Sequence, residues 1–221
     1  MMPGVDVAIT DFPEIESQKK QIERELSKTL VRQICVSKDS KTDENLVTVS
    51  LENIAAGHSW PSGASQDRRA WVELIVYDAD GNVLFESGVL QEGQALTDLE
   101  DPNLWRLGDR MYDENGNEVH MFWEAASYTS ELLPAPTAAS ILDPEYTDVH
   151  RVRGFRYQGA EPARVSLRVR VRAMGLDVLK DLVDSGDLDA GYMDTIPTFN
   201  VGFETLEWTA GNGQSCEPED P

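Results

Sequence analysis

The chain has 221 residues, of which 40% are apolar and 27% charged, and its formal net charge at pH 7 is −21. This length and apolar content suffice for one folded domain with a hydrophobic core. The negative charge excludes nucleic acid and anionic membrane surfaces as expected partners, because both would repel the protein. Cationic proteins and metal ions remain as expected partners. No run of eighteen apolar residues occurs, so the sequence predicts no membrane span.

In chain order, residues 1–15 are predicted to be extended and residues 16–29 helical, because apolar residues recur there with helical spacing. Most of the remaining chain consists of short apolar or alternating runs separated by Gly, Pro, Asn and Asp, which is typical of β-strands. The predicted strands cover residues 30–36, 46–53, 71–77, 83–87, 149–157, 164–172 and 199–208. Residues 119–128 are predicted as a strand or partly buried arm, and residues 176–185 as a short helix.

Strands with turn signals at this spacing predict a mainly β protein, an antiparallel immunoglobulin-like β-sandwich with short helical additions. The predicted organisation has three parts. Residues 1–29 form an extended and helical lead, residues 30–209 form the sandwich domain, and residues 210–221 form a flexible acidic tail.

Residues 53–63, Asn-Ile-Ala-Ala-Gly-His-Ser-Trp-Pro-Ser-Gly, are the most informative stretch. Glycines permit backbone angles that other residues avoid, and proline fixes its own, so this turn can hold His58 and Trp60 in fixed directions at a sheet end. Several backbone groups of such a turn lack strand partners, and an imidazole can satisfy one with each nitrogen. We therefore expect His58 to be largely buried and bonded to its own loop, with Trp60 packed beside it.

This stretch resembles the Asn-x-x-x-Gly-His-x-(aromatic)-Pro-(Ser/Thr)-Gly segment in the β-sandwich at the C-terminal end of many bacterial multihaem c-type cytochromes. Residues 78–88 resemble the hairpin that follows in those proteins, where an Asp-x-x-Gly turn leads into an (aromatic)-x-Ser-Gly end. The resemblance spans about residues 46–88. It implies a sandwich domain, export to the periplasm or cell surface, and association with electron-transfer proteins. No Cys-x-x-Cys-His occurs in the chain, so it lacks the usual motif for attaching c-type haem.

Histidine is scarce, since His58, His120 and His150 are the only ones. Neutral imidazole is a common protein ligand for copper and zinc. A sandwich can bring His58 and His120 to one end, with Met111 and Met121 nearby as soft donors, so these two histidines are the predicted metal ligands. No cofactor is required by the sequence, and copper is the candidate. The alternative is that His58 bonds its own loop and His120 only packs.

The two histidines also resemble the ligand set of the surface copper proteins of methane-oxidising bacteria. Those proteins bind one Cu(I) with two well-separated histidines and a kynurenine formed from the tryptophan two residues before the first histidine. In this chain Ala56 lies two residues before His58, and Trp60 lies two residues after it. The resemblance concerns the ligand pattern, and it implies a mononuclear site of His58 and His120.

Cys35 and Cys216 are the only cysteines. A disulfide between them would join the first strand to the tail and would favour an oxidising compartment, whereas two free thiols are the alternative. The first residues contain no basic-then-apolar export signal, so a cytoplasmic protein or a mature or trimmed exported one is expected.

Four arginines alternate along one predicted strand and form a basic stripe: Arg164, Arg168, Arg170 and Arg172. We expect them to pair with carboxylates on neighbouring strands, in preference to docking an acidic partner or a haem propionate. The acidic stretches 78–82 and 113–118 look like the starts of calcium loops but do not keep the EF-hand spacing. Both are predicted to be hairpin turns.

The sequence contains no nucleophile elbow, P-loop, zinc-protease helix or dinucleotide fingerprint, so no catalytic residue is predicted. The leading hypothesis is an exported, non-enzymatic binding or assembly module that has a protein partner in an electron-transfer assembly containing haem or copper. The first alternative is a mononuclear copper-binding protein that uses His58 and His120. The second is a carboxylate-dependent enzyme acting on a polar substrate.

Overall fold

The computed structural model describes residues 14–138, 140, 142–147 and 149–212, without the side chain of Phe203. The predicted extended segment before residue 14 and most of the predicted acidic tail lie outside the described residues. Helix α2 (Ile15–Leu26) confirms the helix predicted over residues 16–29. It ends three residues earlier than expected. Ile22 and Leu26 on this helix pack against the main core.

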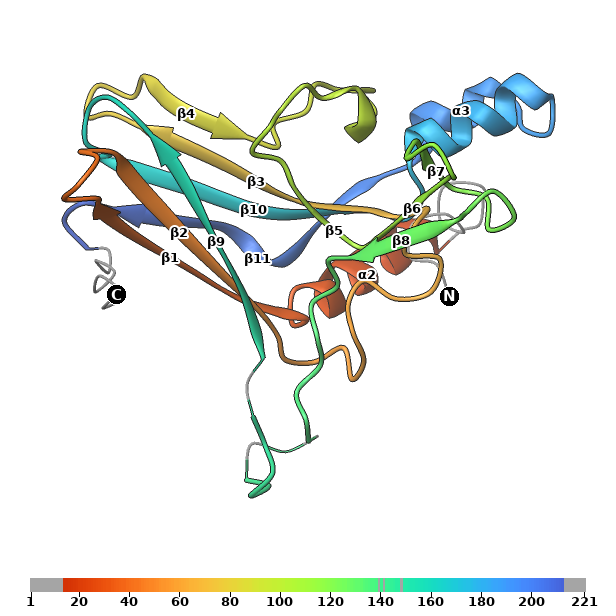
Figure 1. Ribbon diagram of the computed structural model, residues 1–221. Helices are drawn as coiled ribbons and strands as arrows, with labels where there is room; N and C mark the ends of the chain where they lie inside the picture. The colour runs from red at the N-terminus through yellow and green to blue at the C-terminus, as the bar shows by residue number, and fades with distance from the viewer. Residues whose placement is uncertain (1–13, 139, 141, 148, 213–221) are drawn as a thin grey trace.

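Two antiparallel sheets face each other as a β-sandwich (Figure 1). The first sheet has the strand order β1-β2-β9: β1 (Leu30–Lys38), β2 (Asn45–Asn53) and β9 (His150–Tyr157). The second has the order β11-β10-β3-β4, and β5 also pairs with β3. Its strands are β3 (Arg69–Tyr77), β4 (Val83–Ser87), β5 (Trp105–Leu107), β10 (Arg164–Arg172) and β11 (Thr198–Thr209). In immunoglobulin lettering these sheets correspond to A-B-E and G-F-C-C′, so the predicted fold class is confirmed.

The core lies between the two sheets and follows the period of two that β-strands impose. Buried and partly exposed residues alternate along β2 and β10. The inward-facing residues of these two strands are fully buried: Val47, Val49, Leu51, Val165, Leu167 and Val169. Strand β3 differs, because most of its residues on both faces are buried. Its outer face is therefore covered by another part of the chain.

That cover comes from the segment after β4 and from helix α3 (Leu176–Ser185). A second, smaller apolar cluster joins α3 to the short helices η1 (Leu96–Asp98) and η2 (Ala190–Thr195). Its buried members are Ala95, Leu176, Leu179 and Ile196. Figure 1 shows α3 and the segment after β4 on the side of the five-stranded sheet that faces away from β1, β2 and β9.

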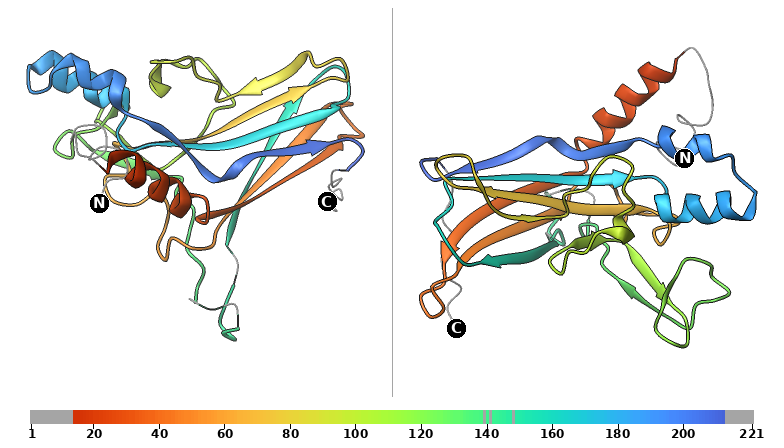
Figure 2. Two further views of the ribbon diagram at one scale, coloured as in Figure 1. Left: turned by 180° about the vertical axis from the view of Figure 1, so that it is seen from behind. Right: turned by 90° about the horizontal axis from the view of Figure 1, so that it is seen from above.

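A third small sheet projects beside the sandwich, as the right-hand view of Figure 2 shows. It consists of β6 (Asp109–Tyr112), β7 (Glu118–Val119) and β8 (Ser127–Ser130), in the order β7-β6-β8. We call residues 109–130 the aromatic arm. The prediction of one strand over residues 119–128 was wrong, because β7 and β8 lie on opposite sides of β6 and the chain must cross between them.

Cys35 on β1 is disulfide-bonded, while Cys216 lies outside the described residues. In the part of the chain that the structure describes, no helix has the length and apolar character needed to cross a membrane.

Candidate functional site

His58 lies in the turn after β2, and its side chain is exposed. Its Nδ1 is 3.0 Å from the carbonyl oxygen of Ser59, so the expected contact with its own loop is present. The expected burial was wrong. Trp60, in contrast, is only 6% exposed and belongs to the main core. Its backbone N–H donates to the carbonyl of Leu133 and its carbonyl accepts from the N–H of Leu133, both at 2.8 Å.

Asn53 satisfies two backbone groups of this turn, whereas His58 contacts one. Its side chain is fully buried, and its Nδ2 donates to the carbonyl oxygen of His58 at 2.7 Å. Its Oδ1 accepts from the N–H of Ala56 at 3.1 Å. Asparagine at the start of a turn often bonds nearby backbone in this way. The first residue of the motif, an asparagine before a turn, is the sequence signal for this contact, and the sequence-based expectation placed it on His58 instead.

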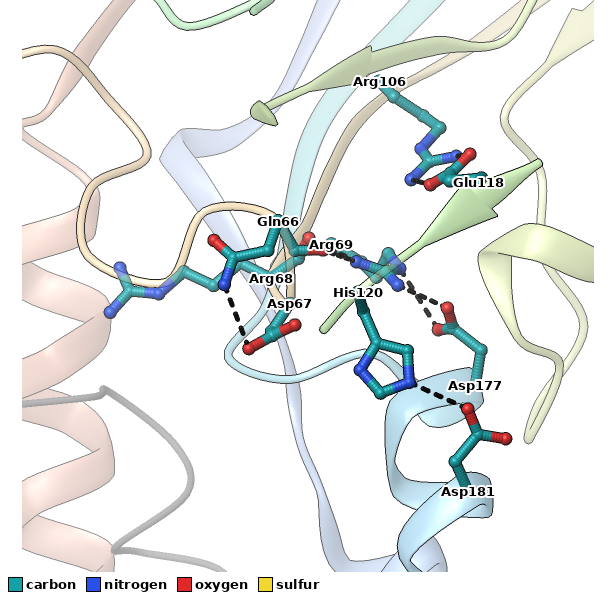
Figure 3. A network of polar contacts seen from close by, with 9 residues as sticks. All are labelled: Gln66, Asp67, Arg68, Arg69, Arg106, Glu118, His120, Asp177 and Asp181. Carbon is teal, nitrogen blue, oxygen red and sulfur yellow. Dashed lines mark hydrogen bonds and ion pairs between the residues drawn. The ribbon is translucent and has the colours of Figure 1, made fainter. Parts of the chain in front are cut away.

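His120 lies just beyond β7 in a polar network that joins the aromatic arm to α3 (Figure 3). Its Nε2 is 2.9 Å from a carboxylate oxygen of Asp181, and its side chain is 20% exposed. The contacts of His58 and His120 are thus separate. Among the described residues, no three His, Cys, Asp or Glu side chains gather into a group that could hold a metal ion. A copper ion bound by the two histidines alone stays a prediction.

Two bidentate ion pairs fasten the elements around His120. Arg69 on β3 is 3% exposed, and its Nε and Nη2 donate to the two carboxylate oxygens of Asp177 on α3. Arg106 on β5 donates to both oxygens of Glu118 on β7 at 2.9 and 2.6 Å. Fork-to-fork pairs of this kind are the strongest and most directional of the charged hydrogen bonds. The four side chains and His120 line a cavity of about 420 Å³.

Asp67 is the least satisfied carboxylate of this network. Among the described residues, its buried Oδ1 has no hydrogen-bond partner, and its Oδ2 accepts from Gln66 at 3.4 Å. Burial raises the pKa of Asp67, against the opposing influence of His120 and Arg69. Asp67 is absent from the residues that line the 420 Å³ cavity, and Arg69 neutralises Asp177, which does line it. The network therefore links α3 to the sheet and to the aromatic arm.

The two acidic turns are hairpin turns, as predicted. Asp78 accepts from the N–H groups of Asp80 and Asn82 at 2.9 and 2.8 Å. Asp113 accepts from the N–H groups of Asn115 and Asn117, both at 2.8 Å. The pKa of Asp78 and of Asp113 is lowered, first by the hydrogen bond from the asparagine side chain that closes each turn and then by these backbone bonds. Each carboxylate therefore stabilises its own turn.

The basic stripe on β10 pairs within the chain at three of its four positions. Arg164 donates to Glu207 at 2.9 Å and lies over the ring of Tyr77. Arg168 and Arg170 both donate to Glu73 on β3. These contacts confirm the expected pairing with carboxylates on neighbouring strands, and only Arg172 departs from it.

The aromatic arm carries the most exposed aromatic side chains that the structure describes. Phe122, Trp123 and Tyr128 are 70%, 78% and 73% exposed. Two of them, Phe122 and Tyr128, border a cavity of about 330 Å³ that also meets the buried Met111. The exposed acids of the arm are Glu114, Glu118 and Glu124. The sequence showed this aromatic run, but we expected it to be partly buried, and its exposure was missed.

No family model matches the chain, and no curated protein matches it. Among solved structures, the chain is similar to a penta-haem cytochrome c552 from Thermochromatium tepidum, with a TM-score of 0.50 and 18% identity. The match covers 85% of this chain and 41% of the cytochrome chain. The chain thus corresponds to about two fifths of that protein's length. At this identity the likeness concerns the fold, and this chain shares the fold of part of a multihaem cytochrome.

Proposed function

We propose that the protein is an exported, non-enzymatic β-sandwich module that docks onto a redox protein containing haem or copper. The fold likeness to part of a penta-haem cytochrome supports this context. The chain contains no Cys-x-x-Cys-His. In this proposal the redox centre therefore belongs to the partner, and the module supplies a binding surface.

The aromatic arm is the observation that carries the proposal. Large aromatic side chains are enriched at the centres of protein interfaces, where Trp and Tyr often dominate the binding energy. Phe122 and Trp123 in the segment between β7 and β8, and Tyr128 on β8, leave apolar area in water, which folding alone does not explain. A partner that covers Phe122, Trp123 and Tyr128 would remove that area from solvent.

The charge of the molecule specifies the partner's docking face. The formal net charge is −21, and the arm exposes Glu114 and Glu124, whereas Arg106 neutralises its Glu118. A surface of this sign speeds association with a positively charged face and repels an acidic one. We therefore propose a redox partner whose contact surface is basic.

The disulfide of Cys35 supports export. Disulfides persist in oxidising compartments such as the periplasm and the cell surface, and they are rare in the cytosol. Thiol labelling of the protein in cells of its native source tests this part of the proposal. Cys35 should resist labelling until a reductant is added.

The docking test compares wild type with a Phe122→Ser, Trp123→Ser double variant. The probe is a basic monohaem cytochrome c, with affinity measured by isothermal titration calorimetry at low and high salt. Because interface aromatics are often worth about 2 kcal/mol each, the double variant should bind more weakly by at least about tenfold. Raising the salt concentration should weaken wild-type binding as well.

Val83→Ser is the matched control, because Val83 is 52% exposed on β4, away from the arm. It should bind the cytochrome like wild type. Equal binding by the arm variant and wild type, or no binding by wild type at low salt, would contradict the proposal.

A further inference from the structure

A cavity of about 630 Å³ lies on the outer face of the five-stranded sheet, away from the aromatic arm. Strands β3 and β10 form its floor, and the segments 89–93 and 193–198 form its walls. In Figure 1 this face is the one covered by α3 and by the segment after β4. The volume lies within the range of small-molecule sites in proteins. We call it the arginine cavity, after three residues of its floor: Arg168, Arg170 and Arg172.

Positive charge exceeds negative charge on the cavity floor. Glu73 is the floor's only carboxylate among the lining residues, and it is 6% exposed. Its Oε1 accepts from Arg168, including the Nε at 2.6 Å, and its Oε2 accepts from Arg170 Nη1 at 3.2 Å. Both oxygens of Glu73 are therefore engaged. The Nε of Arg170 is buried and has no hydrogen-bond partner.

Arg172 contributes a buried charge that no carboxylate neutralises by direct contact. It is 6% exposed, and its Nε and Nη1 donate to Thr198 Oγ1 at 3.1 Å and to the carbonyl of Gln94 at 3.3 Å. Both acceptors are neutral. Within the described part of the chain, no acidic side chain forms an ion pair with Arg172. Burial, and then the nearby Arg170, lowers the pKa of Arg172, while Asp177 acts in the opposite direction without a direct contact.

About half of the residues in the cavity walls are apolar, so the cavity offers apolar surface beside the charged floor. Five apolar side chains line them: Val89, Leu90, Leu176, Met193 and Ile196. Two carboxylates, Glu92 and Asp194, also border the cavity, but both residues are exposed, so solvent screens them. A ligand that fits these surroundings has an anionic head and an apolar body. A carboxylate matches the planar guanidinium groups of the floor.

We propose that the arginine cavity binds a small organic acid, with its carboxylate on Arg170 and Arg172 and its apolar body between the walls. This site is separate from the docking surface on the arm and does not depend on the proposed partner. The acid would pair the buried guanidinium of Arg172, and its chain would cover the apolar walls.

The first test uses wild-type protein and three probes: octanoate, octanol and inorganic phosphate. We expect saturable octanoate binding with a Kd on the order of 1 mM or tighter, followed by calorimetry and by the shift of the Trp71 indole N–H resonance. Trp71 lies on the cavity floor. Octanol and phosphate should each bind at least about tenfold more weakly, because octanol lacks the carboxylate and phosphate lacks the apolar chain. An octanol affinity equal to that of octanoate, an equal phosphate affinity, or no saturation by octanoate would overturn the proposal.

The second test compares Arg172→Gln with Arg164→Gln. Arg164 lies on the same face of the same strand but outside the cavity, so it is the matched control. Arg172→Gln should weaken octanoate binding by at least about tenfold, while Arg164→Gln should leave it unchanged. Equal affinities for Arg172→Gln and wild type would refute the site. If Arg172→Gln does not fold, Arg172→Lys replaces it and should also bind more weakly, because lysine lacks the planar fork.

Discussion

Asn53 holds the turn that contains His58, because its buried amide bonds the carbonyl of His58 and the N–H of Ala56. The imidazole of His58 lies outside, in solvent. A buried amide with both ends engaged stabilises a turn, whereas an exposed ring that bonds one carbonyl competes with water for the same contact.

Asn53→Ala should therefore lower the free energy of unfolding by about 1–3 kcal/mol, since it leaves partly buried backbone groups without partners. His58→Ala should change it by less than about 0.5 kcal/mol, as is usual for exposed positions. Urea denaturation of the metal-free variants measures both values. A larger loss for His58→Ala than for Asn53→Ala would show that the histidine supports the turn after all.

Asp67 gives stability a pH dependence of a definite sign. Burial raises its pKa in the folded protein above the ordinary value of 3.8, so folding disfavours its charged form. The stability it contributes is present below the unfolded pKa and is lost as the pH rises through the folded one. Asp67→Asn should therefore melt at a higher temperature than wild type at neutral pH, and the difference should close near about pH 3.

Asp78→Asn is the control of opposite sign for this measurement. Hydrogen bonds within its turn lower the pKa of Asp78, so its carboxylate is favoured by folding. This variant should melt at a lower temperature than wild type at neutral pH. Calorimetric scans across the pH range follow both variants, and a destabilised Asp67→Asn at neutral pH would contradict the expected sign.

At the scale of elements, Glu73 joins β3 to β10 by accepting from two arginines while it is almost fully buried. Glu73→Gln would leave both guanidinium groups without their carboxylate. Removing one partner of a buried pair is strongly destabilising, and because Arg168 is a third exposed we expect about 3 kcal/mol, the lower end of that range.

Glu207→Gln is the matched comparison for Glu73→Gln. Glu207 pairs with Arg164 between β11 and β10, but both side chains are more than a third exposed. Exposed pairs of this kind are worth about 1 kcal/mol or less. Equal losses for the two variants in urea denaturation would show that burial does not decide the strength of these pairs.

At the scale of the whole molecule, forty acidic residues oppose nineteen basic ones, and the resulting charge of −21 repels itself in the folded state. Salt screens such repulsion over distances of about 10 Å at 0.1 M ionic strength. The melting temperature should therefore rise between low salt and about 0.5 M NaCl, and KCl should raise it equally. A fall in melting temperature with salt would mean that the attractive ion pairs outweigh the net repulsion.

The local pattern of the sequence determined most of the sandwich. Strands β2 and β10 alternate apolar and polar residues, and Asp-Gly marks the hairpin between β3 and β4, so their period and turns are encoded within a few residues. The pairing of the basic stripe also followed, because acidic residues are so abundant. These features depend only on residues that are close in the sequence or on the average composition of the chain.

Only the tertiary structure decided the site. Arg69 and Asp177 are 108 residues apart, and His120 meets Asp181 across 61 residues, so no local pattern could have predicted either contact. The shape of the aromatic arm depends on the pairing of β7 and β8 with opposite sides of β6, which a local pattern does not encode. The arginine cavity exists because α3 and the segment after β4 close over one end of a sheet. Side chains acquire their surroundings when distant segments pack together, and that packing determines which of them are buried, paired or free to bind a partner.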